Sequence, residues 1–284
     1  MIGNRTKQRK MSRRKLLKWS LIISLALIVL IVVIHLIHAL TLDRTIVYRE
    51  ITFRSINVPA HLDGYRIAFL ADEHAMEESR LRAVVDELNS RNLDLLVLGG
   101  DFETAARTAD QSIRILSEVQ TRDGMFGVAG NHDRYHNSLF AALERYGATP
   151  LRNAGQEIRP GFFVAGTRDF WSGYACIATA TQDADPDDFI LLLTHNADVT
   201  MVQDTSHIDL TLSGHTHGGQ ISFFGIWAPY FTFSRHITSY GQRFARGWAT
   251  SRDGTDVFVT VGIGEYLPRV FSRPEVIIIT LRAR

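Results

Sequence analysis

Near the N-terminus lies a run of 24 residues, from Trp19 to Leu42, that contains no Asp, Glu, Lys or Arg. As an α-helix this run is roughly 36 Å long, which exceeds the ~30 Å hydrocarbon core of a bilayer. A secretory signal peptide has a shorter apolar stretch followed by small residues at a cleavage site, a pattern that this run does not show. The run therefore predicts an uncleaved transmembrane helix, and the rest of the chain has to fold beside a membrane.

The residues before this run are strongly basic and include no acid. Their eight basic side chains are Arg5, Lys7, Arg9, Lys10, Arg13, Arg14, Lys15 and Lys18. Because basic flanks stay on the cytoplasmic side, we predict a cytoplasmic tail over residues 1–18 and a single-pass cell-membrane anchor over residues 19–42. The remainder is then expected outside the cytoplasm, although three arginines shortly after the run weaken this asymmetry.

Two features of the N-terminal segment leave alternatives open. Residues 12–18 resemble a twin-arginine export signal, so general export and twin-arginine export are both possible routes. His35 and His38 lie about one turn apart inside the apolar run, and ionisable residues in a membrane helix can mark a functional site. Their place near its outer end favours two neutral imidazoles at the membrane interface.

The rest of the chain is acidic. Without the eight basic residues of the tail, 23 Lys and Arg face 30 Asp and Glu, a net charge of about −7. A basic tail on an acidic body argues against nucleic-acid binding and for a membrane orientation signal. Cys176 is the only cysteine, which excludes an intramolecular disulfide and a cysteine-rich zinc site.

Apolar periodicity after the anchor predicts one large domain. Residues 43–62 are expected to form an extended connector or an edge strand, and residues 63–284 the domain itself. Helices are predicted over residues 77–92, 110–120 and 138–146, and strands over residues 66–70, 93–98, 125–128, 162–165, 189–193, 208–212, 257–261 and 276–281. Strands and helices alternate early, while the later strands have little helix between them. This pattern favours an α/β or α+β fold, in which helices pack around two facing mixed sheets.

Polar residues follow the early predicted strands at regular intervals. Asp72 and His74 follow the first strand, Asp101 the second and Asn131 the third. The spacings of 29 and 30 residues match the length of one βαβ unit. Because the carboxyl ends of parallel strands meet at one edge of a sheet, we expect these side chains to lie together.

Three histidines follow the later predicted strands in the same way: His195, His215 and His217. The complete set is thus two Asp, one Asn and four His. Imidazole mixed with carboxylate suits zinc, manganese or iron better than calcium or magnesium, which prefer oxygen ligands. Seven ligands exceed the needs of one tetrahedral zinc and suit two ions that share a carboxylate.

The clusters together resemble the signature of the calcineurin-like metallophosphoesterases. The five blocks occur in the family's order as Asp72-Glu73-His74, Gly100-Asp101, Gly130-Asn131-His132-Asp133, His195 and Gly214-His215-Thr216-His217. The extended ending Gly214–Gln220 is similar to the branch of membrane-anchored or exported phosphodiesterases. The resemblance implies a four-layer αββα sandwich, preceded here by the transmembrane helix.

The resemblance also implies roles for individual residues. One divalent ion would be held by Asp72, His74, Asp101 and His217, and the other by Asp101, Asn131, His195 and His215. Asp101 would bridge the ions, whose identity could be Mn, Zn or Fe. His132 would coordinate nothing and would protonate the departing oxygen, while Asp133 would either orient His132 or lie solvated in its turn.

Two residues depart from the family pattern. Glu73 replaces an apolar residue, so its carboxylate either lies near the metals or points away from them. Ala71 replaces a serine that often precedes the first aspartate, which removes a hydroxyl near the site.

The expected activity is hydrolysis of a phosphodiester or phosphomonoester by a metal-bridging hydroxide. Aromatic and apolar residues after the last cluster could form a lip for a membrane-proximal or lipid-linked phosphate, or an ordinary core: Phe223, Phe224, Ile226, Trp227, Tyr230 and Phe231. The alternatives are a cytoplasmic hydrolase resembling UDP-2,3-diacylglucosamine pyrophosphatase and a catalytically silent metal-binding scaffold. A metallopeptidase is disfavoured because the H-E-x-x-H motif is absent.

Overall fold

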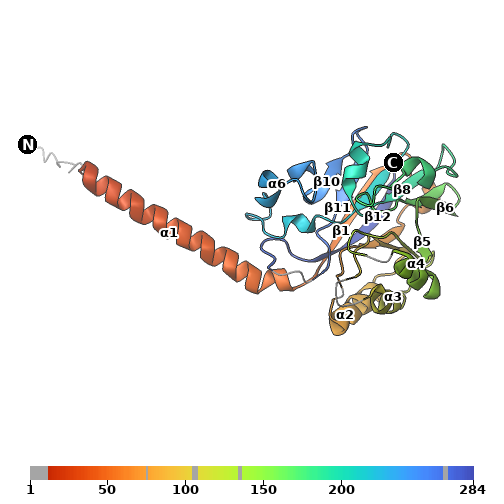
Figure 1. The fold of residues 1–284 in the computed structure, drawn as a ribbon, viewed down its shortest axis with the longest axis horizontal. Coiled ribbons are helices and arrows are strands. Elements are labelled where there is room, and N and C mark those ends of the chain that lie inside the picture. The colour runs from red at the N-terminus through yellow and green to blue at the C-terminus, as the bar shows by residue number, and fades with distance from the viewer. Residues whose placement is uncertain (1–11, 75, 104–107, 134–135, 265–267) are drawn as a thin grey trace, which may run out of the picture.

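The computed structural model describes residues 12–74, 76–103, 108–133, 136–264 and 268–284. Residues 1–11, which carry four of the eight basic side chains of the predicted tail, lie outside the described part of the chain. Helix α1 (Arg13–Leu40) leaves the body as a single long rod with none of its side chains buried (Figure 1). It is long and apolar enough to span a membrane, as the uncharged run predicts.

The body is built on two six-stranded mixed sheets, which confirms the predicted sheet arrangement. The first has the order β1-β12-β2-β3-β4-β5 and the second the order β10-β11-β9-β8-β7-β6. The first comprises β1 (Val47–Ser55), β12 (Glu275–Ala283), β2 (Arg66–Leu70), β3 (Leu95–Leu98), β4 (Met125–Gly127) and β5 (Thr149–Pro150). The second comprises β10 (Gly247–Thr250), β11 (Asp256–Val259), β9 (Leu210–Ser213), β8 (Phe189–Leu193), β7 (Phe162–Gly166) and β6 (Ala154–Arg159).

Helices cover the outer faces of both sheets and give the expected four layers. Helices α2 (Glu78–Asn89), α3 (Ala109–Leu116) and α4 (His136–Arg145) lie along the first sheet (Figure 1). The second sheet is covered more thinly, by α5 (Ile177–Ala180) and the 3-10 turns η3 (Ala197–Met201) and η5 (Gly241–Phe244). The remaining short elements are η1 (Leu42–Arg44), η2 (Ala60–Leu62), η4 (His217–Gly219) and α6 (Tyr230–Phe233).

The apolar pattern of each element explains its place in these layers. Helix α2 buries Leu81, Val84, Val85 and Leu88, which recur at the spacing of one helical face. Strands β2 and β8 are buried on both faces, as expected of strands between a facing sheet and a helical layer. The inward faces of the two sheets share one core cluster that includes Phe69, Phe162 and Phe189.

The segment expected as a connector or edge strand contains the edge strand β1. It pairs in parallel with β12 over nine residues, from Val47 opposite Glu275 to Ser55 opposite Ala283. Just before it, the buried Asp43 carboxylate accepts hydrogen bonds from the backbone N–H groups of Phe271 and Ser272. The end of α1 is therefore fastened to the edge of the first sheet.

The order of the strands gathers the polar loops at one place. Strands β2, β3 and β4 are adjacent and parallel, so the loops after them leave the same edge of the first sheet. Strands β8 and β9 are likewise adjacent and parallel in the second sheet. The loops that follow these five strands carry the candidate ligands, as expected from parallel strand pairing.

Candidate metal centre

The seven expected ligand side chains lie together where these loops converge. Two groups have ligand atoms that all lie within 4.8 Å of one another and could hold a metal ion. One group contains Asp72, His74, Asp101 and His217, and the other contains Asp101, His195 and His215. Asp101 belongs to both groups.

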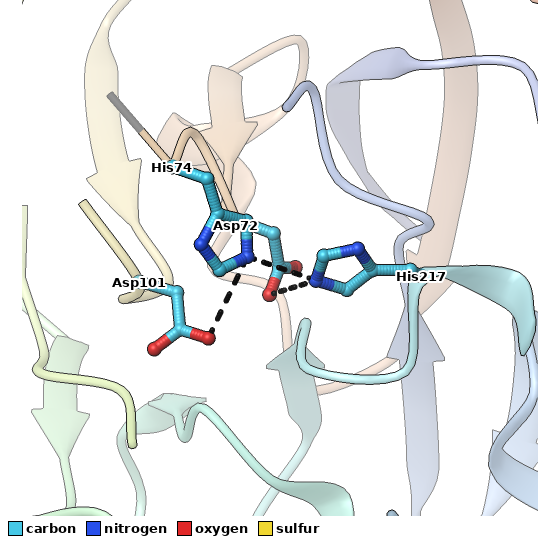
Figure 2. Close-up of side chains that lie close together, drawn as sticks. All are labelled: Asp72, His74, Asp101 and His217. Carbon is cyan, nitrogen blue, oxygen red and sulfur yellow. Dashed lines mark hydrogen bonds and ion pairs between the residues drawn. The ribbon is translucent and has the colours of Figure 1, made fainter. Parts of the chain in front are cut away.

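Figure 2 shows the first group, in which side chains from four loop positions point at one spot. The Nε2 atoms of His74 and His217 are 3.0 Å apart, and His217 Nε2 is 3.3 Å from Asp72 Oδ1. His74 Nε2 is 3.8 Å from Asp101 Oδ2. Nitrogen and oxygen lone pairs thus converge at spacings that a shared cation accommodates.

The second group is arranged around His195, which is fully buried. His195 Nε2 lies 3.2 Å from Asp101 Oδ2 and 3.1 Å from Asn131 Oδ1. Both oxygens are acceptors, so either a proton on Nε2 or a bound cation has to lie between them and the ring. Burial lowers the pKa of His195, but the carboxylates of Asp101 and Asp72 outweigh it and raise the pKa to about 10. A metal ion would supply the same positive charge.

Backbone carbonyls determine which nitrogen of each buried histidine is available. His195 Nδ1 donates to the carbonyl of Gly99 at 2.8 Å, and His215 Nε2 donates to the carbonyl of Ile237 at 2.9 Å. A carbonyl can only accept, so each of these nitrogens carries the proton. The other nitrogen, Nε2 of His195 and Nδ1 of His215, is then the one available to a metal ion, which on His195 would take the place of the second proton.

Burial also favours the neutral, ligand-competent form of two histidines. It lowers the pKa of His74 to about 4 and that of His215 to about 3. For Asp101, burial acts against ionisation, but the adjacent histidines, His195 first, hold its pKa well below the usual range. Near neutral pH His74 and His215 are therefore neutral and Asp101 is ionised, which is the protonation state that divalent metals require of these residues.

The backbone of the site is strained in a way that also points to function. Asp72, His74, Asp101, His215 and His217 all have φ between 49° and 74°, a region that residues other than glycine seldom occupy. Such residues persist where the surrounding structure forces them, and they cluster at active sites. Five of the seven expected ligands share this geometry.

Two glycines allow the loops to approach closely enough. Gly100 has φ of 94°, and a side chain there would meet the backbone nitrogen of Gly130 at 2.5 Å. A side chain at Gly130 would collide with the Asp101 carboxylate and with the His195 ring, which it would meet at 2.7 Å. The loops after β3 and β4 can therefore lie this close together only with glycine at both Gly100 and Gly130.

Asp133 has a role different from the two that we expected. Its carboxylate is fully buried and accepts four backbone N–H groups, those of Gly130, Asp101, Phe102 and Glu103. Burial and the Asp101 charge raise its pKa to about 7, while these donors favour the ionised form. Asp133 therefore fastens two ligand-bearing loops together instead of orienting the His132 ring or lying in solvent.

His132 and Glu73 occupy different surroundings. His132 is exposed, lines the cavity above the ligands, and donates its backbone N–H to Asp101 Oδ1 at 2.7 Å. Its ring contacts the His74 ring at a centroid distance of 5.2 Å. Glu73 is buried, and its carboxylate accepts the backbone N–H of Met76 within its own loop.

A cavity of about 420 Å³ opens over the candidate ligands. Its other walls include Trp171, Gln220, Tyr230 and Ile237. Sequence reasoning missed Trp171, whose ring lies edge-on to His215 at 4.6 Å between centroids. No local sequence pattern marks Trp171. It lies in the loop after β7, which is parallel to β8, so this loop leaves the same edge of the second sheet as the loop that carries His195.

Comparison with known proteins agrees with this geometry. The sequence model of the calcineurin-like phosphoesterases matches residues 65–219, more than half of the chain. An uncharacterised metallophosphoesterase of Campylobacter jejuni is 29% identical over 93% of this chain and 71% of its own length. The phosphodiesterase YaeI of Escherichia coli is 28% identical, covering 76% of this chain and 82% of its own. A zebrafish transmembrane protein with a metallophosphoesterase domain is 28% identical over 79% of this chain and 55% of its own.

Proposed function

Because the chain belongs to the calcineurin-like phosphoesterase family, a family of metal-dependent phosphoester hydrolases, we propose that it hydrolyses a membrane-proximal phosphoester with two divalent ions that share Asp101. The observation that carries this proposal is the membership of Asp101 in both candidate metal groups. A carboxylate in that position can bridge two ions, as in other two-metal phosphoesterases.

The ligands divide into two sets around Asp101. Asp72, His74 and His217 complete the first set, and Asn131, His195 and His215 complete the second. This division is supported by the 3.1 Å contact between Asn131 and His195 and by the carbonyl-held rings of His195 and His215. The mixed nitrogen and oxygen donors suit Mn, Zn or Fe. Ions bound here would lower the pKa of a water molecule and neutralise charge on the phosphate.

The remaining residues of the cavity would handle the substrate. His132 is exposed at the mouth and belongs to neither candidate metal group, and we propose that its ring meets the phosphate and gives a proton to the departing oxygen. Its backbone bond to Asp101 keeps it next to the shared carboxylate. Trp171, Tyr230 and Ile237 give the cavity apolar walls, which favour an ester with an apolar or aromatic group beside the phosphate.

The N-terminal helix supports a membrane-proximal substrate. We propose that residues 19–42 span the cell membrane, that residues 1–18 stay in the cytoplasm, and that the domain over residues 63–284 works outside it, together with edge strand β1. A phosphatase reporter fused after Arg284 should be active, and it should be inactive if the domain is cytoplasmic. A cytoplasmic domain would instead favour the nucleotide-lipid pyrophosphatase alternative.

The test of the activity uses the full chain purified in detergent. Bis(p-nitrophenyl) phosphate should be hydrolysed after loading with at least one of Mn²⁺, Zn²⁺, Co²⁺ or Ni²⁺, and a chelator should abolish turnover. Metal bound without turnover under any of these ions would favour the catalytically silent scaffold.

A further inference from the structure

The loop over residues 221–233 exposes an unusual number of large apolar side chains directly beside the site. Ile226 and Phe233 are 87% and 82% exposed, and Phe223, Phe224, Trp227 and Tyr230 are between 38% and 46% exposed. Phe231, which we grouped with them from the sequence, is buried and packs with Ala228 and Ala245. Phe231 thus holds the loop to the body, while the exposed side chains give its outer face an apolar patch, which marks an interaction surface.

This surface is continuous with the membrane helix. The His35 ring of α1 lies 5.3 Å from the Phe223 ring and 4.8 Å from the Phe224 ring, measured between centroids. Helix α6, at the end of the loop, lies on the side of the body from which α1 departs (Figure 1). The patch therefore faces the same way as the anchor.

The contact with His35 sets the depth of the patch. Crossing a hydrocarbon core of ~30 Å takes about 20 helical residues. Counted from Trp19, the first residue of the uncharged run, such a span ends near His38. His35 then lies at the outer boundary of the hydrocarbon, and the two phenylalanines in contact with it lie at the same depth.

The charges around the loop suit the head groups of a bilayer. Residues 210–252 contain no Asp or Glu but four arginines: Arg235, Arg243, Arg246 and Arg252. Where α1 meets the body, a cavity of about 400 Å³ is lined by Arg49, Arg246 and Arg273, with Glu275 as its one carboxylate. In a body that is acidic overall, this local excess of positive charge attracts anionic lipids.

We propose that the 221–233 loop is a second membrane contact, which inserts its apolar side chains into the interface of the same bilayer that α1 spans. Trp and Tyr are the side chains that favour this zone. Tyr230 also lines the site cavity, as do Gly219 and Gln220 immediately before the loop. The mouth of the site is therefore held against the bilayer surface. The proposal rests on α1 as the membrane span and is independent of the hydrolysis proposed above.

The test places an environment-sensitive probe on the loop in the full chain. Cys176 is replaced by Ser, and single cysteines are introduced as Ile226→Cys and Phe233→Cys for labelling with a nitrobenzoxadiazole dye. The control is Ile56→Cys, a site that is 79% exposed and follows β1, whose nine residues carry the chain roughly 30 Å from the anchor. Each labelled protein is reconstituted into vesicles of phosphatidylcholine and phosphatidylglycerol, with and without brominated acyl chains.

Dyes at positions 226 and 233 should emit at shorter wavelength than the dye at position 56, and brominated lipid should quench them about twofold more strongly. Equal emission and equal quenching at all three positions would overturn the proposal. All three exchanged side chains are highly exposed, so the body should tolerate them. Unchanged thermal melting in detergent checks this. Turnover of a soluble phosphodiester is a separate readout, so loss of activity with strong quenching would count against the proposed function alone.

Discussion

At the scale of single residues, backbone groups decide how the ligand side chains are presented. The carbonyls of Gly99 and Ile237 hold the rings of His195 and His215, and the Asp133 carboxylate binds four N–H groups of two ligand loops. A sequence motif shows which residue types are present but not which backbone atom each one meets. For that reason the ligand candidates could be predicted, whereas the role of Asp133 could not.

The proposed role of His132 predicts a loss that depends on the leaving group. The His132→Gln variant should retain its metal but hydrolyse an alkyl phosphoester about 10²–10³-fold more slowly, since a general acid contributes on this scale. Bis(p-nitrophenyl) phosphate should be affected much less, because p-nitrophenolate departs without needing a proton. Steady-state rates with both substrates measure the difference.

The exposed His61 offers a matched control, because His61→Gln removes an imidazole far from the cavity. That variant should behave as the wild type with both substrates. If His132→Gln slowed the two substrates equally, or lost its metal, His132 would not be the acid.

The lowered pKa of the buried His215 predicts how the stability of the metal-free protein changes with pH. The unfolded chain takes up a proton on His215 near pH 6.5, whereas burial lowers the folded pKa to about 3. The folded state is therefore destabilised as pH falls from 6.5 toward 3, by at most about 1.4 kcal/mol per pH unit for this group. Thermal melting in a chelator at pH 7 and pH 5 should show a smaller drop for His215→Gln than for the wild type. Equal drops would mean that His215 titrates normally in the folded state.

At the scale of elements, the fold follows from the pattern of apolar residues along the sequence. Strands β2, β3 and β4 are short buried runs separated by helices of clear amphipathic period, so their parallel order could be predicted. The ends of the helices are predicted less accurately than their positions. Helix α3 ends at Leu116, whereas the sequence pattern predicts a helix that continues to Gln120. Strand β5 has two residues, and the four residues of β10 alternate only weakly between apolar and polar types, so neither strand can be told from a loop by its sequence.

Glycine at the strand-end loops gives a prediction about packing. Gly100→Ala should lower stability in two ways, through its φ of 94° and through collision with the Gly130 backbone. Gly124→Ala shares the first cost, with φ of 86°, but has no heavy atom within 4 Å of the added methyl group. We expect Gly124→Ala to cost about 1–2 kcal/mol and Gly100→Ala about 1–3 kcal/mol more.

Thermal melting and metal content of the two variants provide the measurement. Gly124→Ala should keep its metal, while Gly100→Ala should lose it together with the close approach of the two loops. Equal melting temperatures and equal metal content would show that the loops are not held as tightly as their geometry indicates.

At the scale of the whole molecule, helix α1 and the site are joined through the first sheet. Strand β1 pairs with β12 along its whole length, and Asp43 ties the end of α1 to the loop before β12. The apolar run and the site motif could each be recognised in the sequence. Their relative placement could not, because it depends on contacts between residues more than 200 positions apart.

The central claim is that two ions share Asp101, and metal analysis of the full-length protein tests it most directly. After loading and gel filtration, the wild type should hold two metal ions per chain. Asp101→Asn should lose most of this metal and at least about 10³-fold in turnover, as expected when a bridging ligand is removed. Asp187→Asn, which changes an exposed carboxylate, should match the wild type. A single ion per wild-type chain, or near-normal metal content and turnover in Asp101→Asn, would contradict the account.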